Sequence, residues 1–300
     1  MTSWLLLAIF AQLLTAVSVV VDRHIVVRAQ YIGKPIVYAF YVSLLSFFVI
    51  ALVPFGVTVP HAWLFFLATL YAALFITAIF YLYSALTEAR ASDAAPVVGA
   101  VSAITTLLVA HVLIDGDVSG SFVAPILLLA VGTALISHFH FTRRAVFCTL
   151  VSGIAFGGVA ITTKLVFLET TFIDGFFWTR MCGVFGALSL LLVPAFRHAI
   201  FSGGAQSTQG AKFMVLGNKV LGGSAAVLTA FAISMGSVSV VNALSGLQFA
   251  FLYLFALLLA PYMPVLMEGG KTRGHGGWQT GLGVAVITTG LALLYINTGS

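Results

Sequence analysis

Apolar runs separated by short polar breaks repeat along the whole chain. A helix needs about 20 mostly apolar residues to cross the hydrocarbon core of a bilayer. Runs of about this length predict ten spanning helices, over residues 4–21, 35–55, 62–85, 94–114, 122–141, 145–165, 173–195, 213–235, 239–260 and 278–296. Because the breaks between them are short, we expect an all-α membrane protein without a globular insert.

Composition supports this prediction and narrows the function. Of the 300 residues, 61% are hydrophobic and 7% are charged, whereas soluble domains carry about 25% charged residues. The basic residues occur singly or in pairs and are not interleaved with exposed aromatics, so the net charge of +5 does not indicate a nucleic-acid partner. Cys148 and Cys182 lie in apolar runs and offer no disulfide framework or metal-ligand spacing.

The first apolar run is interpreted as a retained helix. A cleaved signal peptide begins with a basic region, but Met1, Thr2 and Ser3 carry no lysine or arginine. We therefore expect a multi-pass protein of a cell membrane of the bacterial cytoplasmic type. The expected partners are the lipid bilayer and a small-molecule substrate, with no cofactor, and the chain is expected as a monomer or a homodimer.

The two halves of the chain resemble each other weakly but in the same order. Matching stretches occur at 50–54 and 190–194, at 91–99 and 238–246, and at 132–133 and 289–290. The chain therefore divides into five helices over 1–142 and five over 143–300. Because five is odd, the second unit must enter the membrane from the opposite side. Inverted repeats of this kind are typical of secondary transporters, whose substrate sites lie near the midplane between the units.

Basic residues fall on one side of the predicted ten-helix topology. The odd-numbered connectors hold ten lysines and arginines, and the termini and even-numbered connectors hold none. The ten are Arg23, Arg28, Lys34, Arg90, Arg143, Arg144, Arg197, Lys212, Lys271 and Arg273. Positive charge accumulates on the cytoplasmic side, so both termini are predicted to face outward. Glu88 and Asp93 flank the connector between helices 3 and 4, where we expect them to act as interfacial caps, with Asp93 at the helix N-cap.

Several stretches are similar to those of a known transporter family. They are 83–86 with Ala91-Ser92, the second copy at 230–239 with 242–248, Lys164 near the end of helix 6, 178–180 early in helix 7, and 281–294. On these residues the chain resembles the EamA-like group of the drug/metabolite transporter (DMT) superfamily over nearly its whole length. The resemblance implies ten helices as two inverted five-helix repeats and alternating-access export of small metabolites.

The chain departs from that family at two positions. The family's usual proline in the middle of helix 9 is replaced around Gln248, and helix 1 carries Asp22 where helix 6 carries Lys164. The first of these departures affects the geometry of the family's standard site. The family is also usually drawn with both termini in the cytoplasm, which is the opposite of what the charge distribution predicts.

Arg180 is the leading candidate for substrate binding. An ionised side chain in the hydrocarbon region costs about 2.5–3.5 kcal/mol and needs a compensating role. Arg180 would bind a carboxylate or phosphate through both arms of its guanidinium group. Alternatively, it extends to the headgroups or pairs with Asp174 or Glu169. Lys164 lies near the same connector, and either binds substrate or pairs with Glu169.

Further polar residues in the predicted helices are candidate substrate contacts. Asn218 and Lys219 lie inside helix 8, where either residue would face a cavity unless the helix boundary places Lys219 near the surface. Helix 9 carries a polar series on one broad face that would line a cavity or bond a neighbouring helix, namely Asn242, Ser245 and Gln248.

Aromatic residues and one acid complete the candidate site. Tyr38 and Tyr41 share a face of helix 2, and Tyr38 is the repeat counterpart of Trp178. These rings would wall a pocket for a flat solute, or belong to an interfacial aromatic belt. Asp22 is a candidate proton-coupling site, or pairs locally with Arg23.

These observations favour a secondary active exporter of a small metabolite, such as an amino acid or a related organic solute. The alternative is a flippase for a lipid-linked sugar or polyprenyl phosphate, which requires a lateral opening to the lipid. The third hypothesis is an intramembrane enzyme or a structural subunit. We do not expect an enzyme, because no Walker motif, catalytic triad or paired-carboxylate set is present in the sequence.

Overall fold

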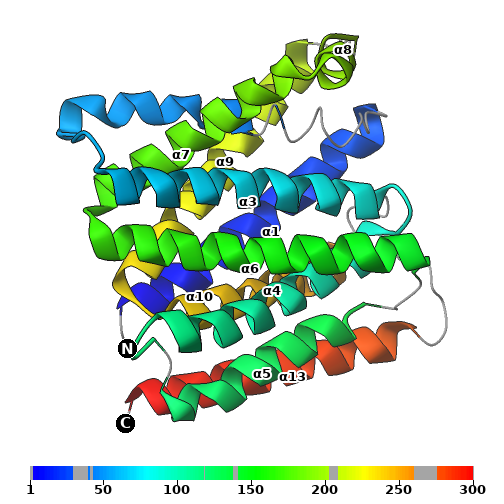
Figure 1. Cartoon of the computed structure of the whole chain (residues 1–300). Coiled ribbons are helices and arrows are strands. Elements are labelled where there is room, and N and C mark those ends of the chain that lie inside the picture. Colours follow the sequence, from blue (N-terminus) through cyan, green and yellow to red (C-terminus); the bar gives the residue numbers. More distant parts are fainter. Residues whose placement is uncertain are drawn as a thin grey trace.

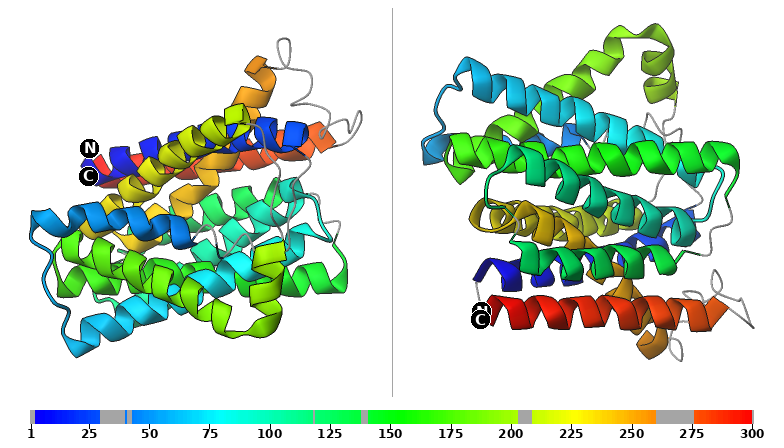
Figure 2. Two further views of the ribbon diagram at one scale, coloured as in Figure 1. Left: turned by 90° about the horizontal axis from the view of Figure 1, so that it is seen from above. Right: turned by 60° about the horizontal axis from the view of Figure 1, so that its bottom comes forward.

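The computed structural model describes residues 3–29, 40, 43–117, 119–137, 141–202, 209–259 and 276–299. These residues are almost entirely helical, and none of them forms a strand (Figure 1). The described helices run roughly alongside one another as a bundle (Figures 1 and 2). The all-α class predicted from the apolar runs is confirmed.

Within the described ranges, eight segments are long and apolar enough to cross a membrane. They are Ser3–Val21 within α1 (Ser3–Ala29), α3 (Ala62–Leu86), α4 (Ala91–Leu113), α6 (Arg143–Glu169), α7 (Phe172–Ser189) with η2 (Leu190–Leu192), Gly217–Met235 within α9 (Gln209–Met235), α10 (Val238–Ala243) through η3 (Leu244–Gly246) into α11 (Leu247–Leu259), and Trp278–Asn297 within α13 (Gly276–Gly299). A membrane protein is therefore indicated by length and composition.

Two further segments are apolar but shorter. They are Ser43–Phe55, which contains the 3-10 helix η1 (Ser46–Phe55), and α5 (Gly120–Leu135). The predicted helix over 122–141 thus ends too late, because α5 stops at Leu135 and the chain leaves the helix through Ile136. Most of the predicted start of the 35–55 helix lies outside the described residues.

The segment around Arg197 is a helix rather than the expected polar break. Helix α7 gives way to η2, and α8 (Pro194–Ser202) then begins at Pro194 in a new direction (Figure 2). Proline has no backbone N–H and its ring clashes with the preceding turn, so it interrupts a continuing helix but suits the first position of a new one. The prediction of one helix over 173–195 is corrected accordingly.

Glycines allow several helices to approach each other closely. A Cβ atom on Gly132 of α5 would lie 2.9 Å from the Gly283 carbonyl oxygen of α13, and one on Gly283 would lie 2.9 Å from the Gly132 carbonyl oxygen. In α6, Cβ atoms on Gly153 and Gly157 would lie 2.6 and 2.7 Å from side-chain atoms of α4. Small residues four apart let backbones meet, which is how membrane helices pack in the absence of a hydrophobic driving force.

The two ends of the bundle differ in charge. Figure 1 places both termini at one end, with the connectors that precede α3, α5, α7 and α10; we call this the termini end. The α3–α4 connector, the start of α6 and helix α8 lie at the opposite end, which we call the basic end because it carries Arg90, Arg143, Arg144 and Arg197. The side chains exposed around the bundle are largely apolar, as at Phe48 and Leu192.

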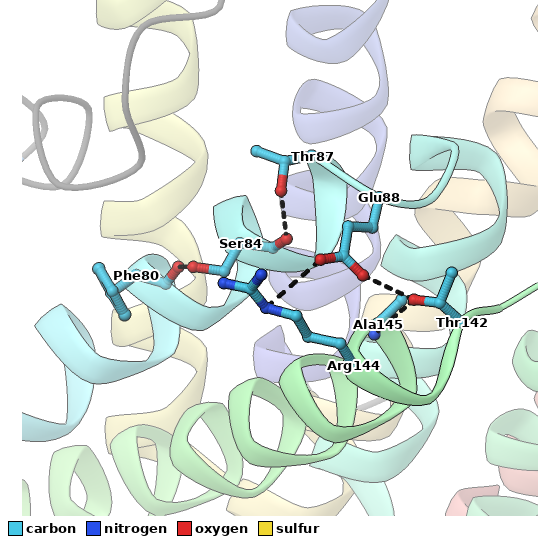
Figure 3. A network of polar contacts seen from close by, with 7 residues as sticks. All are labelled: Phe80, Ser84, Thr87, Glu88, Thr142, Arg144 and Ala145. Carbon is cyan, nitrogen blue, oxygen red and sulfur yellow. Dashed lines mark hydrogen bonds and ion pairs between the residues drawn. The ribbon is translucent and has the colours of Figure 1, made fainter.

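At the basic end, Glu88 ties two helices together (Figure 3). One carboxylate oxygen of Glu88 lies 3.3 Å from Nε of Arg144, and the other accepts a hydrogen bond from the Thr142 hydroxyl at 2.6 Å. Thr142 in turn caps α6 by accepting from the amide of Ala145. The N-cap of α4 is Arg90, so the expectation that Asp93 is the N-cap is wrong. Asp93 lies in the first helical turn and is buried.

Candidate functional site

Arg180 lies on the face of α7 that meets α3. It follows the start of α7 by about 12 Å along the helix axis, and its side chain is half-buried. Its guanidinium carbon lies 5.0 Å from the Phe176 ring centre and 5.7 Å from the Tyr71 ring centre. Among the described residues, no acid pairs with Arg180 and no group hydrogen-bonds to it. Two aromatic faces therefore replace the carboxylate partner that the sequence suggested.

The two acids proposed as partners of Arg180 are engaged elsewhere. Asp174 accepts from the backbone amide of Thr58 at 2.7 Å and from the Thr58 hydroxyl at 3.0 Å. Glu169, the last residue of α6, has a carboxylate oxygen 3.8 Å from Nε2 of His61. The predicted pairing of Arg180 with either acid is thus corrected, because both acids hold the chain that leads into α3.

Trp178 belongs to the same attachment of the η1–α3 connector. Its indole N–H donates to the Thr58 carbonyl oxygen at 2.9 Å, so Thr58 is held by Trp178 and by Asp174 together. Thr171 caps the start of α7: its hydroxyl accepts from the Asp174 amide and donates to the Asp174 carboxylate. Trp178 also packs against buried residues of α3. The ring is therefore a structural element of the interface beside Arg180.

Lys164 caps the end of α9 instead of pairing with Glu169. Its ammonium group donates to the Ile233 carbonyl oxygen at 3.0 Å and to the Gly236 carbonyl oxygen at 2.8 Å. The last carbonyls of a helix have no partner within the helix and carry the negative end of its dipole. A half-buried lysine placed there is stabilised without a carboxylate in direct contact. The Glu169 pairing predicted from the sequence is wrong.

Asp117 caps the start of the next helix, α10. Its carboxylate accepts from the backbone amides of Val238 and Ser239 at 2.9 and 3.2 Å, and from the hydroxyls of Ser237 and Ser239 at 3.1 and 2.7 Å. The Ser237 hydroxyl accepts from the Val240 amide. The turn between α9 and α10 is thus held from one side by Lys164 and from the other by Asp117, each matched to the sign of the helix end it meets.

Asn242 bonds the neighbouring helix α4. Its side-chain amide donates to the Ser102 hydroxyl at 2.9 Å and to the Thr106 hydroxyl at 2.6 Å. Thr106 donates to the Ser102 carbonyl oxygen of its own helix, so the polar groups of this contact satisfy one another. Of the two roles that the sequence left open for Asn242, the interhelical bond is the one observed. The side chain is not available as a cavity wall in this state.

The other two polar residues of this series have no such bond. Ser245 and Gln248 are half-buried, and neither makes a hydrogen bond within the part of the chain that the structure describes. The Ser245 hydroxyl lies 3.9 Å from the position that a Cβ atom on Gly99 of α4 would take. Ser245 and Gln248 therefore stay predicted substrate contacts.

The α9 candidates face α1. The Asn218 amide donates to the Ser18 carbonyl oxygen at 3.1 Å, while its side-chain oxygen is buried and has no hydrogen-bond partner in the described part of the chain. Ser43 carries the other buried oxygen without a partner among the described residues. Lys219 is half-buried and engaged in an interaction, so it is not a free cation.

Three sequence candidates cannot be placed. Tyr38 and Tyr41 lie outside the described residues, and for Asp22 the structure describes only the backbone, within α1. Asp22 directly follows the apolar stretch Ser3–Val21 that is long enough to span a membrane. The aromatic pocket of helix 2 and the proton-coupling role of Asp22 stay predictions.

The structure separates the candidates into distinct groups. Arg180 and Trp178 meet α3, Lys164 meets the end of α9, Asn242 meets α4, and Asn218 meets α1. Sequence reasoning missed Tyr71 and Asp117 as members of these groups, and it named Asp174 only as an alternative partner of Arg180. The Thr171-x-x-Asp174 spacing was a readable capping signal. Nothing local in the sequence marks the contact of Tyr71 with Arg180, because it joins two helices. No three metal-ligating side chains cluster within the described ranges.

Comparison with known proteins informs the fold alone. The chain matches no protein-family model and no curated protein. Among solved structures, 23 chains match. One of these, known from a crystal structure, superposes with a TM-score of 0.67 over 97% of this chain and 98% of that chain, at 17% sequence identity. The fold therefore recurs in a solved protein of nearly the same extent, and the similarity at this identity carries no function.

Proposed function

We propose that the protein is a secondary active transporter that exports a small metabolite, such as an amino acid or a related organic solute. In this proposal two inverted five-helix units, 1–142 and 143–300, alternate access to a site between them, as in the EamA-like group that the sequence resembles. The ten segments are the eight long apolar spans together with Ser43–Phe55 and α5.

The observation that carries the proposal is the pairing of helices from the two halves. Helix α3, the third segment of the first unit, packs on α6, the first segment of the second unit. Correspondingly, α9, the third segment of the second unit, packs on α1, the first segment of the first unit. The fourth segments behave in the same way: α4 packs on α6, and α11 packs on α1. Three further contacts join segments of equal rank in the two units, namely η1 with α7, α4 with α10 and α5 with α13, while α3 also packs on α7. Two equivalent units related by a twofold axis would make this set of contacts, and alternating access uses such a relationship.

The attachments at the ends of the bundle suggest which side is closed. At the termini end, Asp174 and Trp178 hold the η1–α3 connector, and Lys164 and Asp117 hold the α9–α10 turn. In an alternating-access cycle the opening of this end would break those contacts. At the basic end, Glu88 contacts Arg144 and Thr142 (Figure 3), and Gln279 of α13 donates to the carbonyl oxygens of Leu135 and Ser137 at the end of α5. We infer that the structure represents a state closed at the termini end.

A flippase is the second candidate, favoured by one surface feature. An apolar groove on the segment before α3 is lined by Leu44, Leu45, Phe47 and Phe48. Such a groove suits a hydrocarbon chain, and Arg180 would suit the phosphate head of a lipid-linked substrate. This candidate requires a lateral path between the groove and Arg180.

Metabolite profiling tests the two candidates together. Cells that express the protein are compared with cells that express an unrelated membrane protein of similar size, which controls for load on the membrane. Export predicts that specific metabolites rise in the medium and fall in the cells. A flippase predicts an unchanged medium and a redistribution of a lipid-linked intermediate between leaflets. Identical metabolites and lipids in both cell lines would refute transport by this chain.

A further inference from the structure

Arg180 carries a positive charge that the described protein does not neutralise. The charge lies about 12 Å into a spanning helix, and its contacts are the faces of Phe176 and Tyr71. Cation–π contacts attract the guanidinium group but supply no negative charge and accept none of its N–H hydrogen bonds, so the arginine still lacks a counter-ion in the hydrocarbon region. A bound anion would supply the balance.

The contacts of Arg180 leave its hydrogen-bonding capacity unused. A guanidinium group has five N–H donors in one plane, and rings that lie over its carbon do not occupy those donors. No hydrogen bond from Arg180 to any described residue is observed. Two parallel donors match the two oxygens of a carboxylate or a phosphate, so the free edge of the group is suited to bidentate binding of an oxyanion.

A second polar group lies beside the arginine. Tyr71 is 5% exposed, and its hydroxyl has no hydrogen-bond partner in the described ranges. Because the Tyr71 ring centre lies 5.7 Å from the guanidinium carbon, this hydroxyl is a further donor near the N–H groups of Arg180.

We propose that Arg180, between Phe176 and Tyr71, is the oxyanion-binding site of the transporter, and that its substrate carries a carboxylate or phosphate group. This inference rests on the proposed transport function and names the substrate class for it. The aromatic faces hold the guanidinium group in place and exclude water on two sides, while the oxyanion binds at its edge. One arginine without a second cation in direct contact fits a single anionic group.

Binding to the purified full chain tests the site without requiring transport. The probes are phenylacetate, phenyl phosphate and the neutral phenylacetamide, which share a ring and differ in the charged group. Binding is followed by tryptophan fluorescence and by the shift in thermal unfolding temperature. We expect one or both anions to bind and the amide not to bind. A preference for phenylacetate identifies a carboxylate substrate, and a preference for phenyl phosphate identifies a phosphorylated one.

Variants assign the binding to this arginine. Arg180→Gln should weaken anion binding at least about 10-fold, and Arg180→Lys should recover part of it because the charge returns without the planar fork. Arg197→Gln, on the exposed helix α8, is the matched control and should bind as the wild type does. Tyr71→Phe keeps the ring and removes the hydroxyl, so a modest loss is expected.

The outcomes separate this proposal from the proposed function. No binding of either anion, equal binding of the amide, or unchanged binding in Arg180→Gln would overturn the oxyanion site. If Arg180→Gln fails to fold, comparing the binding of the two anions with that of the amide on the wild-type chain still tests the oxyanion site. Anion binding without export would retain the site and overturn the transporter, whereas export that is unaffected by Arg180→Gln would retain the transporter and overturn the site.

Discussion

The ammonium nitrogen of Lys164 lies 2.8 Å from the carbonyl oxygen of Gly236, at the end of α9. A lysine in the apolar core of a membrane protein is ordinarily a functional hypothesis. Here the position of the group gives it a structural role, because two helix-terminal carbonyls take the place of a counter-ion. The same turn is held from its other side by Asp117. The α9–α10 turn is therefore fixed by two opposite charges that do not need to touch.

Replacing Lys164 by methionine should lower stability and leave anion binding intact. The change keeps an unbranched chain and removes two charge-assisted hydrogen bonds, each worth about 1.5–3 kcal/mol when formed. We expect a lower unfolding temperature in detergent with the phenylacetate affinity of the wild type. A loss of affinity at unchanged stability would return Lys164 to the substrate site, as the sequence first suggested.

Replacing Asp117 by asparagine should weaken the start of α10. The amide keeps the shape of the side chain but loses the charge that favours a helix N-terminus, which is worth about 0.3–2 kcal/mol. Asp115→Asn is a matched control, because Asp115 is exposed in the same connector. Unfolding temperatures of the two variants give the comparison, and equal values would show that the charge of Asp117 contributes no stability.

The Asn242 bond to α4 should be measurable by a double-mutant cycle. Asn242→Leu and Thr106→Val each remove one side of the 2.6 Å contact. Interhelical hydrogen bonds in membrane proteins average about 0.6 kcal/mol, so we expect a coupling of about that size and a small loss of stability in Asn242→Leu. Gln248→Leu serves as the control, because Gln248 makes no hydrogen bond in the described ranges. A coupling of zero would mean that the bond does not form in the membrane.

The orientation of the chain can be read from labelled cysteines. The charge distribution predicts that the termini end faces outward. Ser119→Cys, in the exposed connector before α5, should react with an impermeant thiol reagent in intact cells. Arg90→Cys, at the basic end, should react only after permeabilisation. Cys148 and Cys182 are buried and give a low background. The reverse labelling pattern would place both termini in the cytoplasm.

The apolar pattern determined the class of this protein and the approximate position of its helices. The reason is physical: a bilayer accepts a backbone only when its hydrogen bonds close within a helix, and a helix must be long enough to cross it. Ranges such as 62–85 and 145–165 therefore correspond closely to α3 and α6. The predicted end of helix 7 is misplaced because the prediction ignored Pro194, a residue that favours the first position of a new helix.

Only the tertiary structure decided what the polar residues contact. Lys164, Asn242 and Arg180 are equally conspicuous in the sequence, yet the first meets helix-end carbonyls, the second meets two hydroxyls and the third meets aromatic rings. Partners 69, 136 and 109 positions away along the chain supply these environments for Lys164, Asn242 and Arg180. A sequence shows that a charge in lipid needs compensation, but which group provides it depends on how the helices pack, and that is a property of the folded chain.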